Sequence, residues 1–187
     1  KMLADRGLSV PNSYEDLLRP EYKGLISMPN PKSSGTGYIF LKSLVNAWGE
    51  EKAFAYFERF SENVLQYTSS GSGPVSALVQ GEVAIGLGMT AQAVTAINNG
   101  AQLDIAFFQE GAPYNLYGFG IIKGKEHRPE VKEVFQFFHA VLIHDSNRLF
   151  YPEQIYKDTV YEIANYPSNI PYADMSNDTF EEKERLL

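Results

Sequence analysis

The sequence has no cysteine among its 187 residues. This absence excludes disulfide scaffolds, cysteine-rich zinc sites and thiol catalysis. The chain also has no apolar run near the roughly 18 residues that a membrane span needs, and it has no internal repeat. Lysine and arginine are not clustered, and the net charge is −7, so no basic stripe is present for a nucleic acid. Because 44% of the residues are hydrophobic, we expect a packed globular core without a nucleic-acid partner or a membrane span.

Catalytic and metal-binding patterns are also lacking. The three histidines, His127, His139 and His144, form no i, i+4 metal pair and have no acidic ligand cluster beside them. Residues 71–73 fit neither G-x-S-x-G nor G-x-G-x-x-G, because Ser76 stands where the third glycine belongs, and no Walker lysine follows. We therefore expect a protein that is not an enzyme and that holds no metal or cofactor.

What the sequence does contain is an alternation of short apolar runs with helical patterns. Strands are expected at residues 23–28, 64–67, 83–87, 103–107 and 116–122, and helices at 38–48, 50–60, 74–80, 90–97 and 129–143. Thr90 is the expected N-cap residue of the fourth helix. Strands that alternate with helices predict an α/β fold with a largely parallel sheet and helices on both faces. Ligands of such sheets bind at the carboxyl ends of the strands.

Two polar loops follow strands and open helices in this pattern. They contribute Ser33, Ser34, Gly35 and Thr36 from the first loop, and Ser70, Gly71 and Ser72 from the second. Each loop presents backbone N–H groups, small hydroxyls and the positive end of a helix dipole, and glycine lets a ligand oxygen approach the backbone. The pattern predicts an anion site, although each loop taken alone is also explained by ordinary helix capping.

Several segments resemble type 2 periplasmic solute-binding proteins of the iron, phosphonate and sugar-phosphate group. The resemblance is carried by residues 11–18, 22–29 and 33–36, by residues 79–86, and by residues 110–111 followed by 118–124. It covers nearly the whole chain. It implies one nearly complete lobe of a two-lobed fold together with part of the other lobe.

By this resemblance, residues 1–112 form the second ligand-binding lobe. Residues 113–187 form a hinge return strand and carboxy-terminal helices of the first lobe, most of which is missing upstream. The start at Lys1, which reads as the end of a helix, agrees with a missing amino-terminal part. A periplasmic or extracellular location is implied, with lipid attachment through the missing amino terminus as one option.

The resemblance also implies a ligand class and a partner. Ferric-binding members carry adjacent tyrosines where this chain has Ala91 and Gln92, so direct coordination of iron by tyrosine is not expected. We expect a small anionic solute, such as an organophosphate, phosphonate or sugar phosphate, that is delivered to ABC transporter permease subunits. Thr90 and Glu110 are the expected neighbours of the anion, and Glu110 is expected to hold an amine or hydroxyl.

Three other interpretations remain open at this point. One is a protein of the same fold that binds ferric iron or an iron complex. Another is a ligand-sensing receptor domain. The third is a phosphate-handling α/β enzyme that uses Ser34 or Ser72.

Overall fold

The structure, a computed structural model, describes residues 1–187, which separate into two compact units. The first unit contains Lys1–Asn115 and Pro167–Leu187, and the second contains Leu116–Tyr166. The chain therefore leaves the first unit once and returns to it. The sequence-based assignment of residues 1–112 and 113–187 to two lobes stays a prediction, although residues 167–187 pack here with the first unit.

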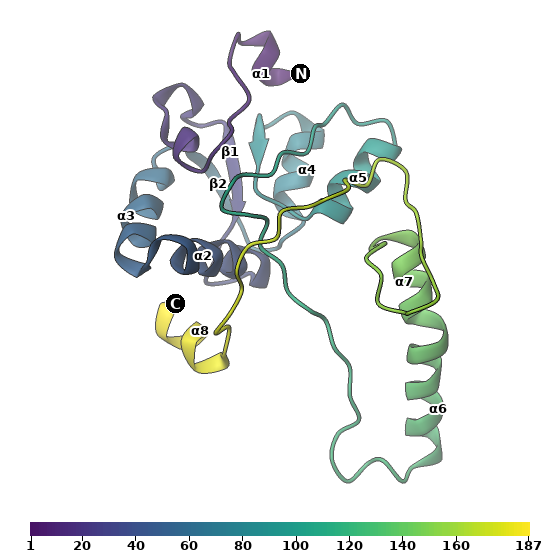
Figure 1. Cartoon of the computed structure of the whole chain (residues 1–187). Coiled ribbons are helices and arrows are strands. Elements are labelled where there is room, and N and C mark those ends of the chain that lie inside the picture. Colours follow the sequence, from purple (N-terminus) through teal and green to yellow (C-terminus); the bar gives the residue numbers. More distant parts are fainter. The chain divides into compact units, whose positions relative to one another are not determined.

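The first unit is built on a three-stranded parallel sheet with strand order β2-β1-β3. The strands are β1 (Ile26–Pro29), β2 (Val64–Thr68) and β3 (Ile85–Gly86). Its helices are α1 (Met2–Asp5), α2 (Gly35–Trp48), α3 (Glu50–Ser61), α4 (Gly73–Gln80), α5 (Thr90–Asn98) and α8 (Phe180–Leu186), with 3-10 turns η1 (Glu15–Leu18) and η2 (Pro20–Tyr22). Helices α2 and α3 lie on one side of the sheet and α4 and α5 on the other (Figure 1). The expected α/β fold, with a parallel sheet and helices on both faces, is confirmed.

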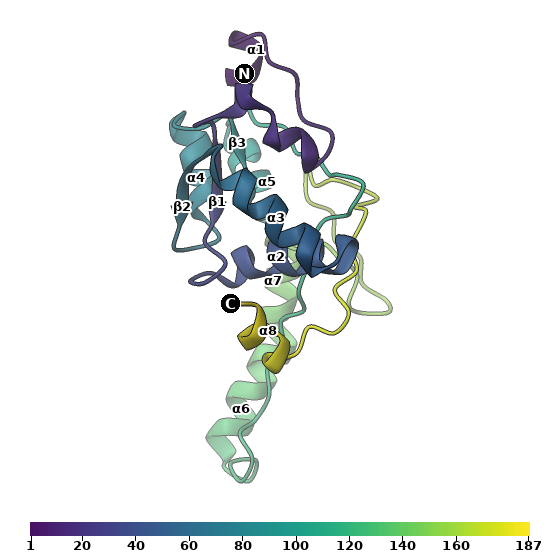
Figure 2. The ribbon, with the colours of Figure 1, turned by 90° about the vertical axis from the view of Figure 1, so that its left-hand side faces the viewer.

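The side chains of β1 alternate between the two faces of the sheet, and both faces are covered by helices. Ile26 and Met28 are fully buried in the core cluster that also contains Leu44 of α2 and Phe60 of α3. Because successive side chains of a strand point to opposite faces, the intervening Ser27 points to the side of α4. The same helices can be followed from a second direction in Figure 2. This two-sided burial fixes the carboxyl end of β1, from which the first polar loop departs.

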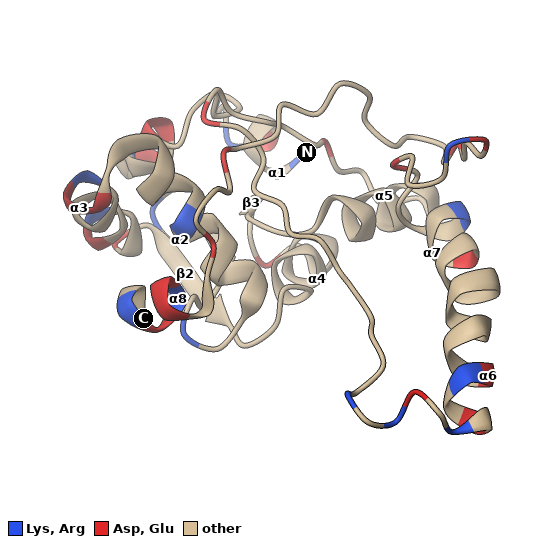
Figure 3. Ribbon diagram, turned by 60° about the horizontal axis from the view of Figure 1, so that its bottom comes forward, with Lys and Arg blue, Asp and Glu red and all other residues tan.

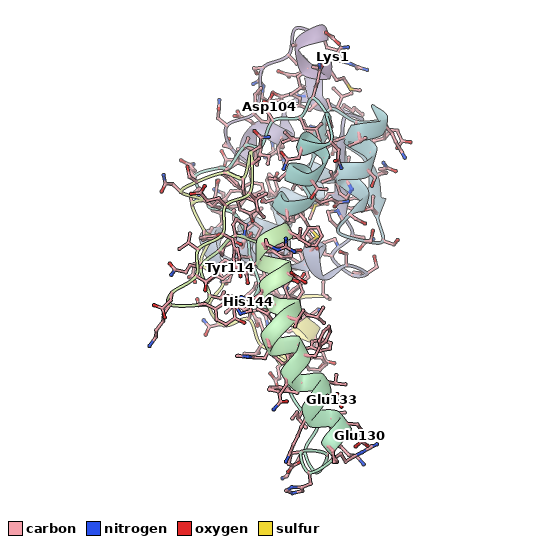
Figure 4. All side chains as sticks on the ribbon, turned by 90° about the vertical axis from the view of Figure 1, so that its right-hand side faces the viewer. Lys1, Asp104, Tyr114, Glu130, Glu133 and His144 are labelled. Carbon is pink, nitrogen blue, oxygen red and sulfur yellow. The ribbon has the colours of Figure 1, made fainter.

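The second unit contains one long helical stretch. It runs through α6 (Pro129–Phe137), the π-helical segment η3 (Phe138–Leu142) and α7 (Ile143–Leu149). Figure 4 shows Glu130 and Glu133 on α6 and His144 on α7. The His144 ring stacks on Tyr156 at 4.2 Å between ring centroids.

Four expectations about elements need correction. No strand forms at residues 103–107 or 116–122, including the hinge return strand, because a strand needs a neighbour to share its backbone hydrogen bonds and these segments pair with none. The strand expected at 83–87 is reduced to Ile85–Gly86, which is all of it that pairs with β1. The helix expected at 129–143 continues through the π segment to Leu149. Thr90 begins α5 rather than capping it, and the N-cap residue is Met89.

Candidate functional site: two helix starts beside one another

The first polar loop runs from β1 into α2. Ser34 is the N-cap residue of α2, and its Oγ accepts a hydrogen bond from the Gly37 amide at 3.4 Å. The Ser34 carbonyl accepts from the Tyr38 amide at 3.0 Å. Gly35 and Thr36 occupy the first two helical positions, whose N–H groups have no partner one turn back in the helix. These two amides are therefore the donors that the loop can offer to an anion.

Gly37 is a site residue that sequence reasoning missed. A β-carbon at this position would lie 2.5 Å from the Pro29 carbonyl oxygen and 2.7 Å from the Asn30 carbonyl carbon. The start of α2 therefore packs directly against the end of β1, which only glycine permits. The sequence did contain a signal for this close packing, because two glycines, Gly35 and Gly37, stand at the start of a helix. A glycine normally weakens a helix, so its presence there needs another reason.

The second loop runs from β2 into α4. The Ser70 and Ser72 hydroxyls lie 2.9 Å apart, and the Thr68 hydroxyl donates to the Ser70 carbonyl at 2.8 Å. Ser72 is the N-cap residue of α4 but its side chain makes no capping hydrogen bond. The Ser72 hydroxyl therefore has no capping role, whereas the Ser34 hydroxyl caps the helix that Ser34 begins.

The two loops touch each other at Gly71 and Thr36. A β-carbon at position 71 would lie 2.2 Å from the Thr36 Oγ1 and 2.8 Å from its Cβ. Such distances are far below van der Waals contact, so the backbone of the second loop approaches the first α2 turn as closely as glycine allows. The structure thus brings Thr36, Gly71 and their neighbours together at the carboxyl edge of the sheet.

A third helix reaches the same place. Gln92, in the first turn of α5, donates from Nε2 to the Ser72 carbonyl at 3.2 Å. Sequence reasoning noted Gln92 only as the replacement of a tyrosine. Its amide now fixes the end of α5 against the second loop.

Ser33, Thr90 and Glu110 are placed differently. The Ser33 amide donates to the Asn30 carbonyl at 3.2 Å, so Ser33 belongs to the turn that leads into α2. Thr90 lines an apolar cavity of about 700 Å³ whose lining includes neither polar loop. Glu110 lies near the buried Tyr14 and Tyr56.

The surroundings of Glu110 are those of a buried aromatic cluster. Burial, helped by the negative charge of Glu110, raises the pKa of the Tyr14 phenol, and the same two causes contribute to a raised pKa at Tyr56. The Tyr14 ring meets Phe108 edge-on at 4.9 Å between centroids. Oε2 of Glu110 is buried and accepts no hydrogen bond.

Backbone dipoles and hydroxyls, rather than cations, dominate the electrostatics of the second loop, whereas Lys32 directly precedes the first loop. From Thr68 to Asn98 the only charged residue is Glu82, at the far end of α4. Figure 3 shows α4 and α5 free of Lys, Arg, Asp and Glu. Helix N-termini attract negative groups without a basic side chain, so the arrangement is suited to holding an anion by hydrogen bonds.

The loop serines have no general base beside them. The hydroxyl of Ser34 is engaged with the Gly37 amide and that of Ser72 with Ser70. No group of three or more His, Cys, Asp or Glu residues is placed to hold a metal ion. No helix of the structure is both long and apolar enough to cross a bilayer. The arrangement can bind and orient a ligand, and it provides no proton acceptor for nucleophilic attack by either serine.

A parallel α/β sheet with two helix starts at its carboxyl edge is compatible with a solute-binding module. Residues 2–143 match the family described as "Bacterial extracellular solute-binding protein". The chain belongs to this family, whose members are solute-binding proteins and not enzymes.

Two solved structures are similar over almost the whole chain. The periplasmic binding protein AfuA from Actinobacillus pleuropneumoniae, solved with exogenous fructose 6-phosphate, is 28% identical, with a TM-score of 0.83 over 99% of this chain and 60% of its own. The periplasmic binding protein P5PA is 29% identical, with a TM-score of 0.79 over 98% of this chain and 60% of its own. These similarities confirm the resemblance to type 2 solute-binding proteins and the partial-lobe character of the chain.

Two curated relatives share parts of the sequence. An uncharacterized protein of Haemophilus influenzae is 38% identical over 65% of this chain and 36% of its own length. The phosphoglycerate transport regulatory protein PgtC of Salmonella typhimurium is 24% identical over 79% of this chain and 36% of its own. The chain thus spans little more than a third of the curated relatives and about 60% of the two solved structures.

Proposed function

We propose that this chain is the anion-holding part of the substrate-binding component of an ABC transporter. Its ligand is a small anionic solute of the organophosphate, phosphonate or sugar-phosphate class. The observation that carries the proposal is the close approach of Gly71 to Thr36, which sets the starts of α2 and α4 beside each other. Isolated helix caps would satisfy their own helices and would not need to meet.

The chemistry of the two loops fits tetrahedral oxyanions. A phosphate or phosphonate group has several acceptor oxygens, and the loops offer the Gly35 and Thr36 amides together with small hydroxyls at Ser70 and Ser72. Hydrogen bonds to an ionised group are roughly twice as strong as neutral ones. Support also comes from AfuA, solved with fructose 6-phosphate, and from the name of the phosphoglycerate relative.

The proposed physiological setting follows from the family. The loaded protein delivers its solute to the permease subunits of an importer, in the periplasm or outside the cell, with lipid anchoring as one form of attachment. Closure of two lobes over the solute would be driven by the additional contacts made in the closed form. A ligand-sensing receptor would use the same loops, and the sequence outside this chain distinguishes it from a transporter component.

Direct iron binding and phosphate-ester turnover are the remaining competitors. Adjacent tyrosines are absent at Ala91 and Gln92, and the loop serines have no base, so neither competitor is favoured by a specific observation. A visible charge-transfer band on addition of ferric citrate would support the first competitor. Release of phosphate from a sugar phosphate, lost on Ser72→Ala, would support the second.

Amide chemical shifts provide a direct test with this chain. The ¹⁵N-labelled protein is titrated with inorganic phosphate, methylphosphonate and fructose 6-phosphate, with potassium chloride at matched ionic strength as the control. We expect saturable shifts at the amides of Gly35, Thr36, Gly71 and Ser72. Shift changes detect dissociation constants near 1 mM, which correspond to about 4.1 kcal/mol of binding free energy. Shifts that are linear in concentration, spread over the surface or equal for chloride would overturn the proposal.

A further inference from the structure

The carboxy-terminal residues run along one face of α2. Tyr38, Lys42 and Asn46 follow one another at intervals of four residues, which places them on a single face of the helix. The Tyr38 hydroxyl donates to Asp178 Oδ1 at 2.8 Å, and Lys42 Nζ donates to Glu182 Oε1 at 3.3 Å. Residues 172–187, which make these contacts, form a segment termed the strap.

The strap also forms hydrogen bonds with α2 beyond its middle and an ion pair with α3. Asn46 donates from Nδ2 to the carbonyls of Asp174 and Ser176, at 2.9 and 3.0 Å. Arg185 forms ion pairs with Glu182 of its own helix at 2.9 Å and with Glu50 of α3 at 2.8 Å. The apolar contact is made by Leu186, which is buried against Tyr38 and Leu41.

Lys42 makes the attachment more than a surface contact. Its side chain is only 2% exposed, and its ion-pair partner is Glu182 of the strap. A buried ammonium group that loses its ion-pair partner is strongly unfavourable. The charge of Asp174 also acts on Lys42, and Asp174 belongs to the strap as well. Loss of the Glu182 charge with the strap still in place would therefore leave the Lys42 ammonium buried without its ion-pair partner.

The face that carries the strap is linked to the first polar loop. Tyr38 binds Asp178 through its hydroxyl, while its backbone amide donates to the carbonyl of Ser34, the N-cap residue of α2. Lys183 adds a cation–π contact, with Nζ 5.1 Å from the centre of the Tyr38 ring. Tyr38 thus contacts both the strap and the N-cap residue of α2.

We propose that the strap is a positioning device for the anion-binding loop, with Lys42 and Glu182 as the positioning pair. The inference deepens the proposed function and rests on it. Attached, the strap holds the first two turns of α2 so that the Gly35 and Thr36 amides stay directed at the anion. When Glu182 is neutral, Lys42 loses its ion-pair partner and that end of α2 loosens.

The test uses four variants of the 187-residue chain. Glu182→Gln removes the ion-pair partner of Lys42, Lys42→Met removes the buried ammonium, and the double variant removes both. Glu181→Gln is the matched control, since Glu181 is the exposed neighbour of Glu182 in the same helix. Amide hydrogen exchange of residues 37–48 is measured without ligand, and the dissociation constant for inorganic phosphate is measured by amide shifts at Thr36.

We expect Glu182→Gln to speed exchange along α2 and to raise the dissociation constant for phosphate by about tenfold, the signature of a stranded buried charge. The double variant should recover most of both losses, because its interior is apolar and neutral at this place. If Glu182 only stabilised α8, the losses of exchange protection and of phosphate affinity in the double variant would equal the sum of the losses in the two single variants. Glu181→Gln should behave as the unmodified chain.

The outcomes separate this inference from the proposed function. If the unmodified chain shows no saturable phosphate shifts, the proposed function fails, while hydrogen exchange still decides whether the strap holds α2. If phosphate binds but Glu182→Gln changes neither exchange nor affinity, the strap is not a positioning device. Equal effects of Glu181→Gln and Glu182→Gln would also overturn it. Where Glu182→Gln fails to fold, Asp178→Asn tests the same face through Tyr38 with the Lys42 ion pair intact.

Discussion

The backbone of Gly71 lies against the side chain of Thr36, closely enough that a β-carbon at position 71 would stand 2.2 Å from the Thr36 hydroxyl oxygen. This contact joins two loops that are separated by α2, α3 and β2 in the sequence. It fixes the spacing between the starts of α2 and α4. Changes at the two loop glycines should therefore have different consequences.

Gly71→Val should lower stability as well as anion binding. The new side chain must displace Thr36, and overpacking of this kind costs about 1–3 kcal/mol. Gly35→Val is the matched comparison, since a β-carbon at Gly35 meets nothing within 4 Å. We expect Gly35→Val to keep most of the unfolding free energy in urea and to lose phosphate binding. Equal stability of the two variants would contradict the contact between the loops.

Ser34→Ala and Ser72→Ala should separate helix capping from ligand binding. Ser34 caps its own helix through the Gly37 amide, so its replacement should lower the unfolding free energy by about 1 kcal/mol. Ser72 makes no capping bond, so its replacement should leave stability nearly unchanged. Both should weaken phosphate binding, by about 1–3 kcal/mol where a hydrogen bond to a charged group is lost. Thermal unfolding beside shift titration measures the two effects, and a Ser72→Ala protein that binds phosphate normally would exclude that hydroxyl from the site.

Particular residues show how far the sequence carries such conclusions. The loops at residues 33–36 and 70–72 were predictable because each follows an apolar strand and precedes a helical pattern. The contact of Gly71 with Thr36 was not, because the distance between two loops depends on strand order and register, which local patterns do not encode. The ion pair of Lys42 with Glu182 joins residues 140 positions apart, and a lysine within a helical pattern is normally a solvated residue.

The strands expected at 103–107 and 116–122 were predicted from the sequence but do not form in the structure. Their residues have strand-like composition, and composition reports only that a segment fits a pleated, half-buried surface. A strand also needs a partner, and here the three paired strands are β1, β2 and β3. Thr90 and Glu110 were placed near the anion by resemblance alone, and their positions in the site stay predictions.

Acid should release the strap before it unfolds the sheet. Hydrogen bonds and ion pairs with Arg185 and Lys42 lower the pKa of Glu182, and hydrogen bonds from Ser176 lower the pKa of Asp174. A carboxyl with a lowered pKa contributes stability above its unfolded value, and this contribution is lost as the pH falls through the folded value. We therefore expect exchange protection of α2 to be constant above about pH 5 and to fall below about pH 4. Glu182→Gln should flatten this dependence, and protection that stays unchanged down to pH 3 would show that the carboxylates do not hold the strap.

The strap meets the outgoing chain where Ala112 and Tyr172 form a parallel β-bridge. The Ala173 amide donates to the Ala112 carbonyl at 2.9 Å, and the Tyr114 and Tyr172 rings meet edge-on at 5.2 Å. Gly111 is what allows this approach, since a β-carbon there would lie 2.5 Å from the Ala173 nitrogen. Residues 111–112 and residues 172–173 are therefore held together by backbone contact.

Gly111→Ala should open this bridge, and Gly100→Ala provides the control. Both glycines have left-handed backbone, with φ of +91° at Gly111 and +95° at Gly100, so alanine is strained at either position. A β-carbon at Gly100 meets nothing within 4 Å, whereas one at Gly111 collides with the backbone of Ala173. The difference between the two variants therefore measures the collision alone. We expect Gly111→Ala to lose roughly 1–3 kcal/mol more unfolding free energy in urea than Gly100→Ala, because overpacking adds to the shared strain. Hydrogen exchange at the Ala112 and Ala173 amides should become faster only in Gly111→Ala, and equal exchange in both variants would mean that the bridge does not depend on this glycine.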